Sequence, residues 1–93
     1  MMRIHKYDFP IDDYVNVLLP KDARILKFLT IHKSEGYRVF LWALFDDENA
    51  DIFEMRKFRV YGTGHDINMD KEFLLYLDTV EQYPFIWHIF EIK

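Results

Sequence analysis

The sequence predicts a mainly β protein, a small antiparallel β-sandwich or barrel of about seven strands with at most one short helical turn. Short apolar or alternating stretches recur at near-regular spacing and are separated by turn residues. These stretches are rich in the aromatic and β-branched residues that favour strands, and 18% of the chain is Phe, Trp or Tyr. A length of 93 residues is enough for one domain, 1–93, and too short for two.

Four strands are predicted in the first half of the chain. Their expected bounds are Ile4–Phe9, Tyr14–Leu19, Ile25–Lys33 and Tyr37–Asp46. The connections between them carry turn residues, at Pro10–Asp13, Pro20–Asp22 and Ser34–Gly36. The final glycine of the third connection fits a hairpin with a bulge. Since the fourth strand is apolar on both faces, we expect it to be central and covered on both sides.

Three strands are predicted in the second half, at Phe53–Tyr61, Leu74–Glu81 and Phe85–Ile92. Before the first of them, Asp46–Asp51 is an acidic loop without the glycine and spacing of an EF-hand, so we interpret it as solvated. Asn68–Glu72 is polar and could form one helical turn.

A short helix that continues from this turn to about Leu75 is an alternative to the strand, because Met69, Phe73 and Leu77 repeat at helical spacing. The strand is favoured, because the residues that follow include the strand formers Tyr76, Thr79 and Val80. We also expect four large aromatic residues in or near the core: Phe40, Trp42, Trp87 and Phe90.

The most distinctive local pattern is Phe58–His65, an alternating strand that ends in Gly-Thr-Gly-His. Glycine permits a positive φ, and successive N–H groups in such a turn can form an anion-binding nest. One face of the strand is basic and ends in a phenol. The alternative interpretation is an ordinary glycine turn after a strand with solvated Lys and Arg. The candidate ligand-binding residues are Lys57, Arg59, Tyr61, Gly62, Thr63, Gly64 and His65, with Trp87 and His88 ranked second.

The residue types exclude several kinds of chemistry. There is no cysteine, so disulfides and cysteine zinc sites are excluded, and the four histidines show no paired metal-ligand spacing. The only serine, Ser34, lies in a predicted hairpin turn and has no nucleophile motif around it. We therefore predict no metal and no cofactor. An enzyme is the disfavoured alternative, as a metal-independent phosphodiesterase or nuclease in which His65 and His88 act as acid and base.

Charge and hydrophobicity narrow the range of partners. The net charge of −4 argues against binding a long nucleic acid, and no apolar run is long enough for a membrane span. The N-terminus lacks a signal-peptide pattern, so cytoplasmic residence is expected. At 51% hydrophobic, the chain has more apolar residues than a minimal core needs, which favours a homo-oligomer interface or a ligand pocket. Aromatic residues beside a basic strand are also how a nucleotide is held, although placement of these residues in the core is the favoured interpretation.

Four segments resemble a family of small uncharacterised proteins of bacteriophages and prophages: Leu19–Leu26, Leu41–Asp46, Phe58–His65 and Pro84–Glu91. Gly-Thr-Gly-His and Trp-His-x-Phe-Glu are the most specific parts, and the match is looser at Asp46-Asp47 and Asp78. The resemblance implies a phage origin and an all-β fold, and it implies no activity.

The sequence and the resemblance together predict a non-catalytic, phage-encoded binding protein that acts in the host cytoplasm, as a host-takeover or counter-defence factor. Its expected partners are a small anionic nucleotide or a host protein, and a second copy of the chain in a homo-oligomer. A structural phage component is a further alternative.

Overall fold

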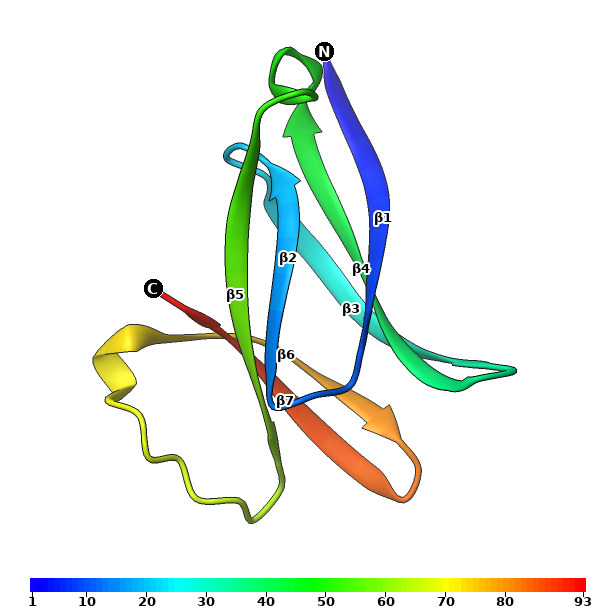
Figure 1. Cartoon of the computed structure of the whole chain (residues 1–93), viewed down its shortest axis with the longest axis vertical. Helices are drawn as coiled ribbons and strands as arrows, with labels where there is room; N and C mark the ends of the chain where they lie inside the picture. Colours follow the sequence, from blue (N-terminus) through cyan, green and yellow to red (C-terminus); the bar gives the residue numbers. More distant parts are fainter.

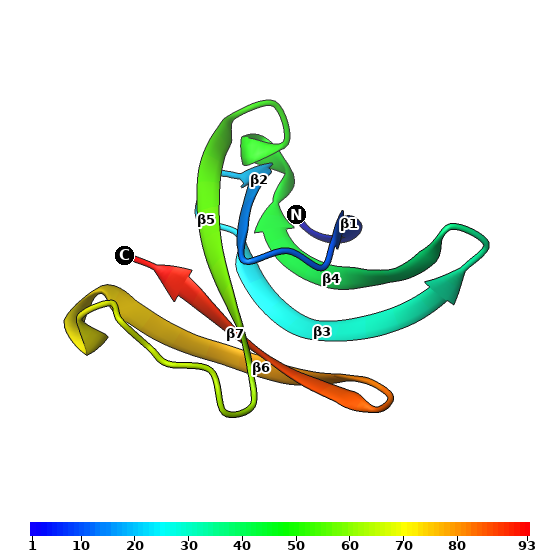
Figure 2. The same cartoon turned by 60° about the horizontal axis from the view of Figure 1, so that its bottom comes forward.

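Seven antiparallel strands form two sheets in the computed structural model, which describes residues 1–93. The first sheet has the order β1–β4–β3, with β1 at Met2–Pro10, β3 at Arg24–Lys33 and β4 at Gly36–Asp46. The second has the order β2–β5–β7–β6, with β2 at Tyr14–Pro20, β5 at Phe53–Gly62, β6 at Leu74–Gln82 and β7 at Phe85–Ile92. Figures 1 and 2 show the two sheets from two directions. This sandwich-like arrangement confirms the predicted fold class, and each strand lies within two residues of its expected bounds.

The core lies between the sheets and is centred on three phenylalanine rings. Phe9 comes from β1, Phe28 from β3 and Phe58 from β5, and their ring centroids are 5.9–6.2 Å apart. Alternate residues of β4, among them Val39 and Leu41, complete the core and are fully buried. The core therefore joins both sheets through residues that alternate along each strand, as the pleat of a strand requires.

The four aromatic residues expected in or near the core differ in their placement. Phe40 is buried as expected, but it lies on the outer face of its sheet, where the ammonium groups of Lys6 and Lys33 cover its ring at 5.0 and 5.4 Å. The other three aromatic residues expected in or near the core are partly buried: Trp42, Trp87 and Phe90. Trp87 packs against the edge of the core cluster.

Two short 3-10 turns are present, one more than predicted: η1 at Asp47–Asn49 and η2 at Lys71–Phe73. The alternative helix to Leu75 is wrong, because β6 begins at Leu74, directly after η2. Asp46 caps η1 by accepting a hydrogen bond from the Glu48 N–H at 3.0 Å, and this bond lowers the pKa of Asp46. Neither helical segment is long and apolar enough to cross a membrane.

The edges of the two sheets meet between β3 and β6. The Phe28 N–H donates to Asp78 Oδ2 at 3.1 Å, and the Thr30 hydroxyl donates to the carbonyl oxygen of Glu81. Each strand also bulges there, at Ile25–Lys27 in β3 and Tyr76–Asp78 in β6. Polar contacts thus cover both of these sheet edges.

Candidate functional site

The Gly-Thr-Gly-His turn begins where β5 ends. The Gly62 N–H donates to His65 Nδ1 at 3.1 Å, and the His65 N–H donates to the carbonyl oxygen of Gly62 at 3.1 Å. Since Nδ1 accepts, the proton of the neutral imidazole is on Nε2. Gly64 has φ +88°, a conformation that favours glycine. The turn is therefore closed by its own histidine, which is held in one orientation.

Glycine is favoured at position 62 because the imidazole of His65 lies directly against it. A Cβ on Gly62 would lie 2.9 Å from His65 Cε1. We expect Gly62→Ala to lower the free energy of unfolding by about 1–3 kcal/mol, because the extra methyl displaces the ring. In a His65→Ala background the same change should cost less than ~1 kcal/mol. Urea denaturation of the four proteins measures this coupling, and an equal cost in both backgrounds would contradict the contact.

The turn leaves few backbone donors for an anion. The Gly62 N–H is bonded to the histidine ring, and the Thr63 N–H donates to the carbonyl oxygen of Ile86 at 3.3 Å. The His65 N–H donates to Gly62 and closes the turn. The Gly64 N–H is therefore the one backbone N–H of the turn without a partner. The expected nest of several free N–H groups is therefore not formed, and one N–H is available to a ligand.

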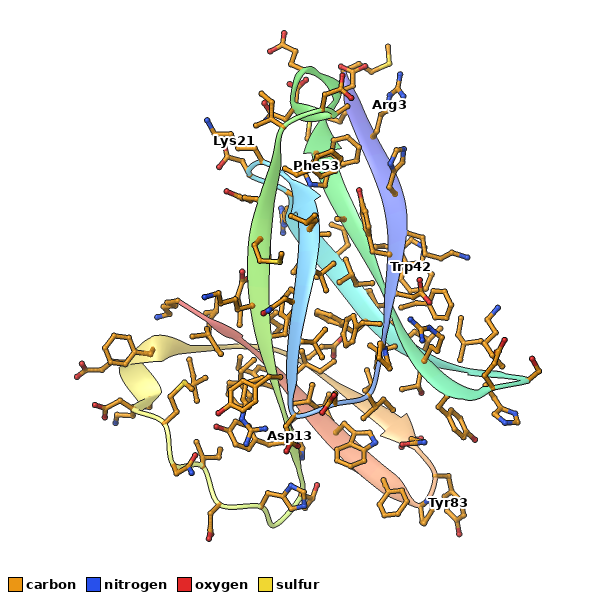
Figure 3. The ribbon with its side chains drawn as sticks, viewed as in Figure 1. Arg3, Asp13, Lys21, Trp42, Phe53 and Tyr83 are labelled. Carbon is orange, nitrogen blue, oxygen red and sulfur yellow. The ribbon has the colours of Figure 1, made fainter.

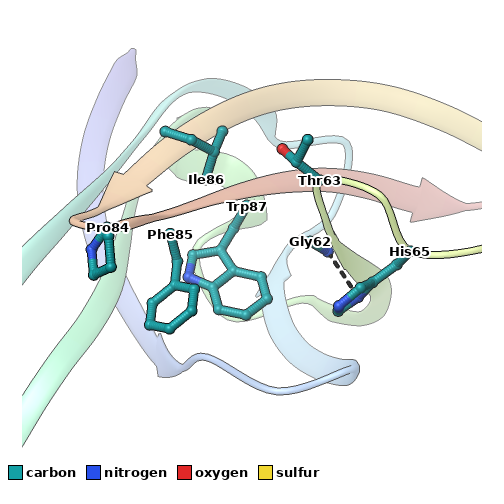
Figure 4. Close-up of a pocket in the computed structure, with 7 residues that line it drawn as sticks. All are labelled: Gly62, Thr63, His65, Pro84, Phe85, Ile86 and Trp87. Atoms are coloured by element: carbon teal, nitrogen blue, oxygen red, sulfur yellow. Dashed lines mark hydrogen bonds between the residues drawn. The ribbon is translucent and has the colours of Figure 1, made fainter.

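A row of three rings lies beside the turn on one side of β7: Phe85, Trp87 and His65 (Figure 4). The rings of Phe85 and Trp87 are stacked at 30°, with centroids 5.8 Å apart. The His65 ring meets Trp87 edge-on at 6.4 Å. Trp87 Nε1–H donates to Gln82 Oε1 at 2.9 Å across the β6–β7 hairpin, which satisfies the indole and fixes its orientation.

The turn and the row of rings line an open cavity of about 470 Å³. Its lining residues are Gly62, Thr63, His65, Pro84, Phe85, Ile86 and Trp87. Four of the predicted site residues thus meet here, namely Gly62, Thr63, His65 and Trp87. The sequence did not predict the other three lining residues, Pro84, Phe85 and Ile86, as site residues. The alternation of Phe85 with Trp87 on one face of the strand was a signal for Phe85.

A second, smaller cavity of about 210 Å³ lies on the other side of the turn. It is lined by Tyr61, Gly62, Thr63, Gly64, His65, Ile67, Tyr76, His88 and Phe90. Tyr61 and His88, both predicted site residues, therefore line this cavity and not the larger one.

Hydrogen bonds hold the imidazole of His88 between two strands. Its Nε2 lies 2.8 Å from Thr63 Oγ1, and its Nδ1 lies 3.1 Å from Thr79 Oγ1. Thr79 Oγ1 in turn lies 2.6 Å from the hydroxyl of Tyr76. Both ring nitrogens of His88 are thus engaged, so this side chain links the turn to β6.

Lys57 and Arg59 do not line either cavity. The Arg59 guanidinium lies over the rings of Tyr14 and Tyr61, at 4.7 and 4.0 Å from their centroids. It also donates to the carbonyl oxygen of Asp13 at 3.1 Å. Lys57 is exposed further along β5. The basic face predicted from the sequence exists, but neither of its charged side chains lines a cavity at the turn. No group of three or more His, Cys, Asp or Glu side chains is arranged to hold a metal ion.

The whole chain, residues 1–93, matches the family model of a domain of unknown function, DUF7352. No curated protein and no solved structure matches the chain. The family match agrees with the coarser part of the resemblance seen in the sequence, a family without an assigned activity. The phage origin stays a prediction.

Proposed function

Because the chain belongs to the DUF7352 family, whose function is unknown, we propose a function from its site: a non-catalytic binding protein that holds a small nucleotide. The observation that carries this proposal is the row of rings beside the 470 Å³ cavity, formed by Phe85, Trp87 and His65. Aromatic side chains bind any nucleobase through its π-face, and each stacked base is worth about 1–3 kcal/mol. The cavity has a volume in the range of known small-molecule sites.

Two donors at the turn are suited to a phosphate group. They are the Nε2–H of His65, which lines both cavities, and the free N–H of Gly64, which lines the smaller one. No Lys or Arg lines either cavity, so in this proposal stacking supplies most of the affinity and the phosphate only orients the ligand. Nucleosides and nucleotides should therefore differ little in affinity.

Trp87 fluorescence tests the proposal when Trp42 is replaced by Phe, because Trp87 is then the only tryptophan. We expect saturable quenching by adenosine monophosphate. Adding Phe85→Ala should weaken binding about 5- to 150-fold, the equivalent of ~1–3 kcal/mol for one lost stacking partner.

Phe53→Ala is the matched control for this titration. Phe53 is exposed to the same extent as Phe85, 54% against 56%, and lies at the other end of the molecule from the β6–β7 hairpin, whose tip carries Tyr83 (Figure 3). It should leave the dissociation constant unchanged. The absence of quenching, or an equal loss of affinity in the two phenylalanine variants, would contradict the proposed function.

A host protein is the second candidate ligand, and the β6–β7 hairpin favours it. Tyr83 at the tip is 90% exposed and Phe85 is next to the cavity. Exposed aromatic residues of this kind are enriched among the anchors of protein interfaces. A partner bound there would occupy the same row of rings, so it would compete with the nucleotide for Trp87.

The catalytic alternative has less support than binding. His65 and His88 both line the smaller cavity, but each ring nitrogen of His88 is hydrogen-bonded to a threonine hydroxyl, so its contacts are those of a side chain that holds the turn in place. The resemblance to phage proteins supports the proposal that the binding protein acts in host takeover or counter-defence, in the host cytoplasm. A structural phage component would instead be found in purified virions.

A further inference from the structure

The four edge strands of the two sheets are protected to different degrees. The edges of β3 and β6 cover each other and both strands bulge. β1 carries three charged residues, Arg3, Lys6 and Asp8. β2 has the sequence Tyr-Val-Asn-Val-Leu-Leu-Pro, with no charge, and its ladder with β5 runs without a bulge. Charges and bulges are among the devices that keep sheet edges from pairing with other chains, and β2 lacks both; its one proline, Pro20, stands at the end of the strand.

The backbone of β2 is also unpaired on its outer side. Tyr14–Leu19 form no backbone hydrogen bond other than those of the sheet ladder, in which β2 has β5 as its one neighbour. β1 belongs to the other sheet, and no ladder joins it to β2. The outward N–H and C=O groups of β2 therefore have no partner within the chain.

Exposed apolar side chains lie on β2 and on the neighbouring strand β5, next to this unpaired edge. Leu18 of β2 and its neighbour Met55 of β5 are 53% and 51% exposed, and Phe53 next to them is similarly exposed. Tyr14 at the start of β2 is exposed as well. The outer face of this sheet thus presents an apolar strip that reaches the unpaired edge, where an added strand would place its own side chains beside those of Tyr14 and Leu18.

We propose that a second copy of the chain pairs with this edge, β2 against β2, antiparallel about a two-fold axis at Asn16. Strand addition needs a second unpaired strand, and β2 is the one edge strand of this protein that carries neither a charge nor a bulge, so a second copy supplies a matching edge. The register about Asn16 places Tyr14 opposite Leu18 of the second copy and Val15 opposite Val17 of the second copy. The two Asn16 amides, each both donor and acceptor, face each other. The two four-stranded sheets then form one continuous sheet of the dimer.

Substitutions at Asn16 test this register by sedimentation velocity. Asn16 is exposed and lies across the ladder from Lys57, so Asn16→Asp gains a neighbouring opposite charge within the monomer. At the two-fold axis it places two carboxylates opposite each other, and we expect the wild-type dimer to become a monomer. Asn16→Lys should do the same through two ammonium groups. An equimolar mixture of the two variants should restore a dimer, because one carboxylate then faces one ammonium group.

Ser34→Asp and Ser34→Lys are the matched controls, since they bring the same charges to the exposed β3–β4 turn. Both should sediment as the wild type does. Circular dichroism should show that every variant is folded. A wild-type monomer at micromolar concentration, a variant at Asn16 that stays dimeric, or a mixture that stays monomeric would each overturn the proposal.

Discussion

Phe58→Ala is expected to lower the free energy of unfolding by about 3–5 kcal/mol. The ring of Phe58 is fully buried and is stacked on Phe9 at 6.1 Å, while Phe28 meets it edge-on at 5.9 Å. These rings come from three strands in two sheets, so a cavity at this point loses contacts on both sides of the sandwich. A domain this small has a total stability of only ~5–15 kcal/mol, and the variant should therefore be partly unfolded at moderate urea concentrations.

Urea denaturation followed by circular dichroism measures this cost. Phe53→Ala is the control on the same strand, because Phe53 points to the solvent and its removal should change stability by ~0.5 kcal/mol or less. Equal unfolding midpoints for the two variants would show that the three-ring cluster is not the centre of the core.

Glu91→Gln is expected to have the second-largest effect, a loss of about 2–4 kcal/mol. Arg56 donates to both carboxylate oxygens of Glu91, and its Nη2 lies 2.8 Å from Glu91 Oε1. Its Nη1 also donates to the carbonyl oxygen of Ala23 at 2.8 Å, at the start of the other sheet. The hydrogen bonds to Glu91 raise the pKa of Arg56. Only 18% and 15% of the two side chains are exposed, so removing one charge leaves the other poorly solvated.

A double variant separates the contribution of the charges to stability from the contribution of side-chain packing. Arg56→Met with Glu91→Leu replaces the ion pair by apolar side chains of similar size, and it should recover part of the stability lost in Glu91→Gln. The matched control is Asp8→Asn, which breaks the exposed pair with Arg38 and should cost less than ~1 kcal/mol. A midpoint of Glu91→Gln indistinguishable from that of Asp8→Asn would contradict the role assigned to the buried pair.

Strand positions could be predicted because local patterns determine them. β7 has the bounds expected from its aromatic alternation, and the turn at Gly62–His65 was expected from its two glycines. Alternation on β4 could not show which of its two apolar faces is the core, because that depends on which sheet covers it. In the structure the face of β4 that carries Leu41 packs into the core, and Trp42 lies on the outer face of the sheet.

The candidate site could be predicted only in part, for a related reason. Neighbours along the chain, such as Gly62 and His65, were grouped correctly. The stacking of Arg59 on Tyr14 depends on the β2–β5 register, and the link from His88 to Thr63 depends on the β5–β7 register. Contacts of this kind join residues far apart in sequence, and a single sequence does not encode the register in any local pattern.

Chemical-shift mapping with adenosine monophosphate tests the proposed nucleotide site most directly. Nitrogen-15-labelled protein gives separate signals for the two indole N–H groups, and Trp42 on the other sheet is an internal control for Trp87. The account predicts that the Trp87 indole and the Gly62–His65 amides shift together and saturate, while the Trp42 indole does not move. A spectrum unchanged at these positions, or shifts confined to another surface, would contradict it.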